Sequence, residues 1–138
     1  MGANDYQVGG SHYQGKQAEY QHWDWVTDSG MHYLFACPTK YVIRWRDKGG
    51  IKDLEKAIHY LAKAEERCVH YYSYETHQKL MLLNDQYRDF YNAIPIRERN
   101  IVHAILMDNT IKAKHLLAEL ISNEDFNGEA DAAYTNQG

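Results

Sequence analysis

The sequence has few of the features that mark secreted, zinc-binding or membrane proteins. It contains only two cysteines, Cys37 and Cys68, and they form no Cys-x-x-Cys pair, so neither a disulfide scaffold nor a zinc motif is predicted. No apolar run approaches the roughly 20 residues of a membrane span, and the opening MGANDYQVGGSHYQG lacks the pattern of a signal peptide. These absences predict a soluble cytoplasmic protein with reduced thiols.

A general excess of positive charge is also missing. The chain carries 15 Lys and Arg against 19 Asp and Glu, and four of these acids lie in the last fifteen residues: Glu124, Asp125, Glu129 and Asp131. The rest of the chain is therefore neutral, whereas a protein that binds long nucleic acids usually has a basic face. We expect no specific nucleic acid partner.

Signatures of the common nucleotide enzymes are absent. The chain has no Gly-x-x-x-x-Gly-Lys-[Ser/Thr] phosphate loop, no Gly-x-Ser-x-Gly elbow and no dinucleotide fingerprint. It also lacks the Glu-x-x-Glu pairs that hold magnesium in helical nucleotide pyrophosphohydrolases. His59, His70 and His77 do not follow a metal-binding spacing, so no metal site is predicted.

Apolar residues recur at helical intervals, and no alternating strand pattern competes, so we predict a compact all-α domain of about four helices. Glycine- and proline-containing turns would separate helices at about residues 17–27, 31–48, 51–83 and 98–122. Pro38 should kink or restart the second helix, and Asp108-Asn109 is a candidate break in the fourth. The long third helix favours an oligomer contact or a break near Tyr71–Tyr74.

Positive residues gather on both sides of the predicted turn at Gly49-Gly50. Lys40, Arg44 and Lys48 are four apart and share one helical face, whereas Arg46 points elsewhere. The turn brings this helix end close to the N-terminus of the next helix, where free amide hydrogens attract phosphate. The pattern is typical of a site for a nucleotide phosphate chain.

Three further charged residues follow this turn. Lys52 and Lys56 are again four apart, and Asp53 lies in the first turn of the new helix. A solvated helical face is the alternative interpretation, in which lysines pair with nearby acids. Those pairs would join Lys48, Lys52 and Lys56 to Asp47, Asp53 and Glu55.

Aromatic residues could complete such a site. The chain has 12 tyrosines and 3 tryptophans, and rings of this kind either fill a core or stack on a base. Tyr41 and Tyr60 lie at or beside apolar stripes, so both roles stay open for them. His12 and Tyr13 lie in a Gly-rich arm that could fold back over the phosphates, or they are ordinary loop residues.

Several of these residues stand in a distinctive order. It reads Ser11-His12-Tyr13, Gln21-His22-Trp23-Asp24-Trp25-Val26, Lys40-Tyr41-x-x-Arg44 and Lys48-Gly49-Gly50-x-x-Asp53-Leu54-x-Lys56-Ala57-x-x-Tyr60-Leu61. This order resembles a small phage domain family that includes the nucleotide kinase of T-seven-type podophages. The resemblance covers residues 11–66. The segments Ala36-Cys37-Pro38 and Arg46-Asp47 depart from the pattern of many relatives.

The resemblance implies transfer of a phosphoryl group from a nucleoside triphosphate to a deoxynucleoside monophosphate, with no phosphate loop and no required metal or other cofactor. A site of that kind must neutralise phosphate charge with Lys, Arg and helix amides. Residue chemistry at the matching positions then predicts Lys40, Arg44 and Asp53 as catalytic. The predicted nucleotide- and phosphate-binding residues are His12, Tyr13, Tyr41, Lys48, Lys52, Lys56 and Tyr60.

The predicted organisation is a flexible arm at 1–10, a nucleotide-binding core at 11–66, a helical extension at 67–123 and an acidic disordered tail at 124–138. We expect a homo-oligomer that acts on nucleotides in the cytoplasm of an infected bacterial host. Two alternatives stay open. One is a non-catalytic protein that binds or sequesters nucleotides, and the other is a protein that binds a host factor.

Overall fold

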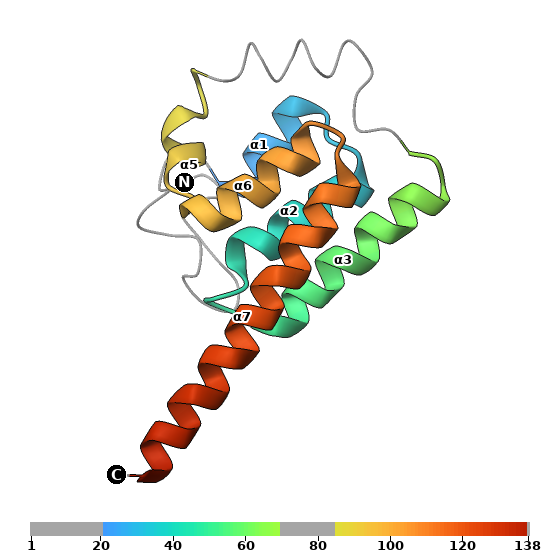
Figure 1. The fold of residues 1–138 in the computed structure, drawn as a ribbon. Coiled ribbons are helices and arrows are strands. Elements are labelled where there is room, and N and C mark those ends of the chain that lie inside the picture. Colours follow the sequence, from blue (N-terminus) through green and yellow to red (C-terminus); the bar gives the residue numbers. More distant parts are fainter. Residues whose placement is uncertain (1–20, 70–84, 138) are drawn as a thin grey trace.

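The computed structural model describes residues 21–69 and 85–137, with side chains described as far as Glu124. Within these ranges the chain is helical and has no strand (Figure 1), which confirms the predicted all-α fold. The helices are α1 (His22–Ser29), α2 (Tyr33–Arg44), α3 (Ile51–Glu66), α5 (Arg88–Asn92), α6 (Ile96–Leu106) and α7 (Thr110–Gln137). The arm predicted at 1–10 lies outside the described residues.

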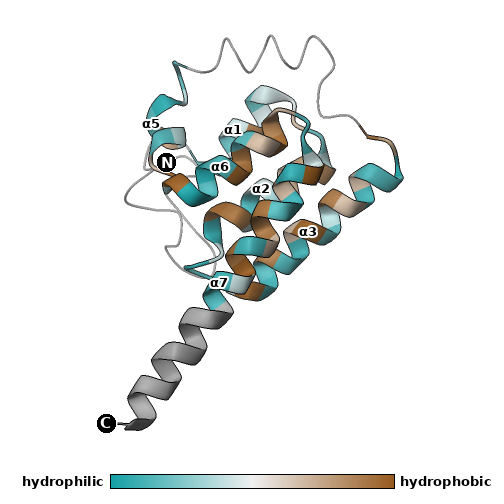
Figure 2. Ribbon diagram, viewed as in Figure 1, coloured by the Kyte–Doolittle hydropathy of each residue, from teal (hydrophilic) through white to brown (hydrophobic). Residues whose placement is uncertain are grey.

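Four of the helices enclose the core. Helix α2 packs against α3 and α6, and α7 packs against the same two helices, so the four surround a common interior. Helices α2, α3, α6 and the coloured part of α7 carry both hydrophobic and hydrophilic residues (Figure 2), as expected for elements that bury one face. Side chains that expose no surface fill this interior: Phe35, Leu54, Leu61, Ile105 and Leu117.

The short helices α1 and α5 pack against each other beside this bundle. The rings of Trp25 and Phe90 lie 5.5 Å apart between centroids, and the Tyr87 hydroxyl donates a hydrogen bond to the Asp28 carboxylate. Helix α5 was not predicted, because its five residues are too few to show a helical period. The described residues therefore form more helices than the predicted four.

Helix α3 ends at Glu66, so the prediction that it continues to Leu83 is wrong. Cys68 adopts a left-handed conformation with φ of 54°, the Val69 amide donates to the Ala64 carbonyl, and the Cys68 amide donates to the Glu65 carbonyl. These two bonds form a Schellman motif, which usually requires glycine and was therefore not predicted at a cysteine. The alternative break at Tyr71–Tyr74 lies outside the described residues.

The predicted break at Asp108-Asn109 is confirmed. Asp108 has φ of 58°, and the amides of Asp108 and Asn109 donate to the carbonyls of Ile105 and Ala104, so α6 ends in a second Schellman motif before α7 begins. Helix α7 continues to Gln137 through the stretch predicted as an acidic tail. The side chains of that stretch beyond Glu124 lie outside the described residues.

Helix α2 runs as one helix through Pro38 and does not restart there. Proline removes one backbone hydrogen bond from a helix interior, and here the ring itself is buried, which offsets part of that loss. His32 caps the start of α2, because its Nδ1 accepts a hydrogen bond from the Leu34 amide at 3.0 Å. Continuous helix on both sides of Pro38 keeps Tyr33, Tyr41 and Arg44 on one rigid element.

Candidate functional site

The turn between α2 and α3 is built around Asp53. Its Oδ2 accepts hydrogen bonds from the Gly49 amide at 3.1 Å and from Arg44 Nε at 3.2 Å, and the carboxylate is 1% exposed. A Cβ at Gly49 would lie 2.1 Å from Asp53 Oδ1, so only glycine fits this position. Gly50 has φ of 63°, which glycine adopts readily. The Gly-Gly pair is thus required by the turn, as predicted.

Asp53 lies beneath the site and holds Arg44 in place. A buried carboxylate must keep charged or hydrogen-bonding partners, and Arg44, with 15% of its side chain exposed, supplies both. Lys56 Nζ approaches Asp53 Oδ1 at the longer distance of 3.9 Å. The contacts of Asp53 are those of a positioning residue, and its predicted catalytic role stays a prediction.

Three cations surround the ring of Tyr41, and we call this group the Tyr41 cation cluster: Lys40, Arg44, Lys56 and Tyr41 itself. Lys40 Nζ lies 5.1 Å from the ring centroid, Arg44 Cζ 5.0 Å and Lys56 Nζ 5.6 Å. All three distances are within the range of a cation–π interaction. Among the described residues Asp53 is the acid that pairs with this group, so the described part of the cluster carries more positive than negative charge.

A row of tyrosine rings leads away from this cluster. Tyr60 of α3 lies 5.8 Å from Tyr41 and 5.8 Å from Tyr33 between ring centroids, and the Tyr33 and Tyr60 hydroxyls are 3.3 Å apart. The hydrogen bond with Tyr33 raises the pKa of the Tyr60 hydroxyl above its usual value. Sequence reasoning nominated Tyr41 and Tyr60 but missed Tyr33, whose eight-residue separation from Tyr41 on α2 was the available signal.

His22 is a second residue that sequence reasoning did not nominate. Its Nε2 lies 2.9 Å from the Thr39 hydroxyl, and that hydroxyl donates to the Ala36 carbonyl at 2.9 Å. Burial, and then the nearby charges of Lys40 and Arg44, lower the pKa of His22 to about 3. The imidazole is therefore neutral near pH 7 and adds no positive charge to the site.

Not every predicted cation joins the cluster. Lys48 and Lys52 are exposed, and within the described residues no ion pair joins them to Asp47 or Glu55. Of the three lysine–acid pairings in the alternative interpretation, the described residues show one, the long Lys56–Asp53 contact. His12 and Tyr13 lie outside the described residues, so their predicted approach to the site stays a prediction.

Arg46 points away from the cluster, as predicted. Its Nε donates to Glu98 Oε1 of α6 at 2.9 Å, and the Trp45 indole N–H donates to the same oxygen at 2.9 Å. Glu98 is 2% exposed, and this contact joins the end of α2 to α6 across 52 residues of sequence. It fixes the end of α2 from which Arg44 projects.

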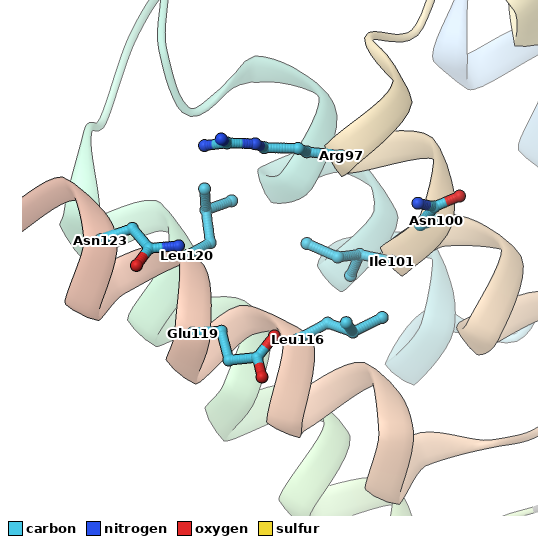
Figure 3. Close-up of a pocket in the computed structure, with 7 residues that line it drawn as sticks. All are labelled: Arg97, Asn100, Ile101, Leu116, Glu119, Leu120 and Asn123. Carbon is cyan, nitrogen blue, oxygen red and sulfur yellow. The ribbon is translucent and has the colours of Figure 1, made fainter.

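A cavity of about 180 Å³ lies elsewhere, between α6 and α7 (Figure 3). Ile101, Leu116 and Leu120 supply its apolar part, whereas Arg97, Asn100, Glu119 and Asn123 supply its polar part. Arg97 and Glu119 are both exposed and carry opposite charges, so together they give the cavity no excess of positive or negative charge. Of the predicted site residues that the structure describes, none lines this cavity.

The described residues hold neither a candidate metal site nor a candidate membrane span. No group of three His, Cys, Asp or Glu side chains there is arranged to hold a metal ion. Nor does any described helix combine the length and apolar character needed to cross a membrane.

Comparisons with protein-family models, curated proteins and solved structures found no match to this chain. The resemblance to the phage family therefore stays a prediction.

Proposed function

We propose that the protein binds nucleotides at the Tyr41 cation cluster and transfers a phosphoryl group from a nucleoside triphosphate to a deoxynucleoside monophosphate. The observation that carries this proposal is the convergence of Lys40, Arg44 and Lys56 on one tyrosine ring. The three cations come from two helices, α2 and α3, and meet at one ring, whereas cations on a single helical face would lie spaced along that helix. Such a group matches a phosphate chain beside an aromatic ring.

The cluster supplies the electrostatic part of phosphoryl transfer. The guanidinium of Arg44 is oriented by Asp53 through Nε, and a fork held in this way is preorganised for phosphate oxygens. Lys40 and Lys56 flank it as point charges from α2 and α3. Positioning and charge stabilisation are the main demands of this reaction, because its transition state spreads negative charge over the equatorial oxygens.

A second candidate function is nucleotide binding without turnover. The observation that favours it is the burial of Asp53, whose Oδ2 already accepts two hydrogen bonds and whose side chain is 1% exposed. A carboxylate placed in this way does not reach a substrate hydroxyl or phosphate. Turnover would then rest on cations alone, and binding without turnover would make the protein a nucleotide store.

Calorimetric titration with deoxynucleoside mono- and triphosphates tests the site. Lys56→Ala removes a charge from the cluster, and Lys63→Ala is its matched control, because both lysines lie on α3, are about half exposed and contact an acid three residues away. We expect Lys56→Ala to weaken triphosphate binding roughly 10- to 150-fold, the range for a hydrogen bond to a charged group. Lys63→Ala should bind as the wild type does.

Turnover separates the two candidate functions. A triphosphate labelled in its γ-phosphoryl group, incubated with each deoxynucleoside monophosphate, should give labelled deoxynucleoside diphosphate if the protein is a kinase. Binding without labelled product would favour the store, and equal affinities of wild type and Lys56→Ala would refute the site itself.

A further inference from the structure

The aromatic row ends in an exposed ring that the proposed reaction does not yet use. Tyr33 is the first residue of α2 and is 63% exposed, although large aromatic side chains are usually at least half covered. Its ring packs against Tyr60 at 68° between ring planes, and the two hydroxyls are 3.3 Å apart. Tyr33 is thus both accessible and held in position.

The separation between Tyr33 and the cations is set by α2. Eight residues of α-helix place the backbone of Tyr41 about 12 Å along the axis from that of Tyr33. Tyr60 fills the interval, with its ring 5.8 Å from each of the other two. A ligand that contacts the Tyr33 ring must therefore be long to reach Lys40, Arg44 and Lys56.

We infer that Tyr33 is the stacking surface for the base of a nucleoside triphosphate whose phosphate chain lies at the Tyr41 cation cluster. This inference rests on the proposed function and extends it, because it assigns the base and the phosphates to opposite ends of one row. A monophosphate stacked on Tyr33 would leave its phosphate short of the cations, whereas a triphosphate reaches them. The site is therefore that of the phosphoryl donor.

The stacking contact is favourable for any base, since every base presents a flat π-face. The Tyr33 and Tyr60 hydroxyls contact each other at the edge of the row, so they are not required for stacking. Tyr33→Phe should therefore keep the affinity for a triphosphate, whereas Tyr33→Ala should lose it. This pair of variants separates the ring from its hydroxyl.

Three ligands test the inference by calorimetry: a deoxynucleoside triphosphate, the matching monophosphate and inorganic tripolyphosphate, which has phosphates and no base. Tyr33→Ala should weaken triphosphate binding roughly 5- to 150-fold, the range for base stacking on an aromatic side chain. Tripolyphosphate binding should be the same for wild type and both variants. Tyr33→Ala should weaken monophosphate binding by a smaller factor than triphosphate binding, because the monophosphate is the acceptor of the proposed reaction and its phosphate does not reach the cations from Tyr33.

Failure of the inference can be told from failure of the proposed function. If Tyr33→Ala binds the triphosphate as the wild type does, or if it loses monophosphate affinity by as large a factor as triphosphate affinity, the assignment of the base is wrong and the phosphate site stands. An equal loss of tripolyphosphate and triphosphate binding in Tyr33→Ala also overturns the assignment, because the ring would then act through the fold. If neither triphosphate nor tripolyphosphate binds the wild type, the proposed function fails as well.

Discussion

Substitution of Gly49 by alanine should strongly destabilise the α2–α3 turn. The added Cβ would lie 2.1 Å from Oδ1, 2.2 Å from Cγ and 2.4 Å from Oδ2 of Asp53, distances that real Cβ atoms do not show. Asp53 must then move away from the Gly49 amide at 3.1 Å and from Arg44 Nε at 3.2 Å. Breaking a fully buried ion pair costs about 3–5 kcal/mol, and the partial exposure of Arg44 reduces this to about 2–4 kcal/mol.

Thermal and urea unfolding measure this loss. A domain of this size loses about 3–4 °C in Tm per kcal/mol, so Gly49→Ala should lower Tm by roughly 6 to 16 °C. Gly30→Ala is the matched control, because Gly30 has φ of 68° and no atom within 4 Å of an added Cβ. Its free energy of unfolding should fall by only about 1–2 kcal/mol, the cost of placing alanine in a left-handed conformation.

A double-mutant cycle tests the cause. In the Asp53→Ala background, alanine at position 49 meets no carboxylate, so Gly49→Ala should add little to the loss already caused by Asp53→Ala. Additive losses, or a Gly49→Ala variant no less stable than Gly30→Ala, would refute the steric reasoning.

Three further substitutions test other contacts by urea unfolding. The folded chain keeps His22 neutral with a pKa of about 3, so below pH 6.5 the unfolded chain binds more protons than the folded one. The free energy of unfolding therefore falls as the pH falls, by at most about 1.4 kcal/mol per pH unit. In His22→Asn the free energy of unfolding should depend less steeply on pH than in the wild type, and equal slopes would contradict this. The hydrogen bond from Lys114 lowers the pKa of Glu65, so Lys114→Met should lose at most about 1 kcal/mol at pH 7, and this loss should shrink as the pH falls and Glu65 becomes protonated. A difference between the two chains that does not change with pH would count against the ion pair. Glu98→Ala should lose about 2–4 kcal/mol, because it leaves the Trp45 indole N–H buried without its acceptor, and a loss below about 1 kcal/mol would disprove that role.

The parts of the fold that depend on local sequence could be predicted. Glycine at 49 and 50 marked the turn between α2 and α3, and Asp108-Asn109 marked the break between α6 and α7. The end of α3 could not be predicted in this way, because its left-handed residue is Cys68. Local signals identify a helix end only where the usual residue occupies it.

The site was predicted in part for a similar reason. Lys40 and Arg44 are four residues apart, so helix geometry places them on one face of α2. Lys56 lies in the next helix, which a short turn connects to α2. The burial of Asp53 and the partner of Arg46 depend on packing; that partner, Glu98, lies 52 residues away in sequence. The separation of Tyr33 and Tyr41 along α2 was available from the sequence, but their contacts with Tyr60 of α3 depend on how the two helices pack.

The central claim is that the Tyr41 cation cluster binds the phosphates of a nucleotide. The most direct measurement is a crystal structure of the full chain with a deoxynucleoside triphosphate. We expect the phosphate chain to lie among Lys40, Arg44 and Lys56. A nucleotide bound in the cavity between α6 and α7, or at any place away from these three side chains, would contradict the claim.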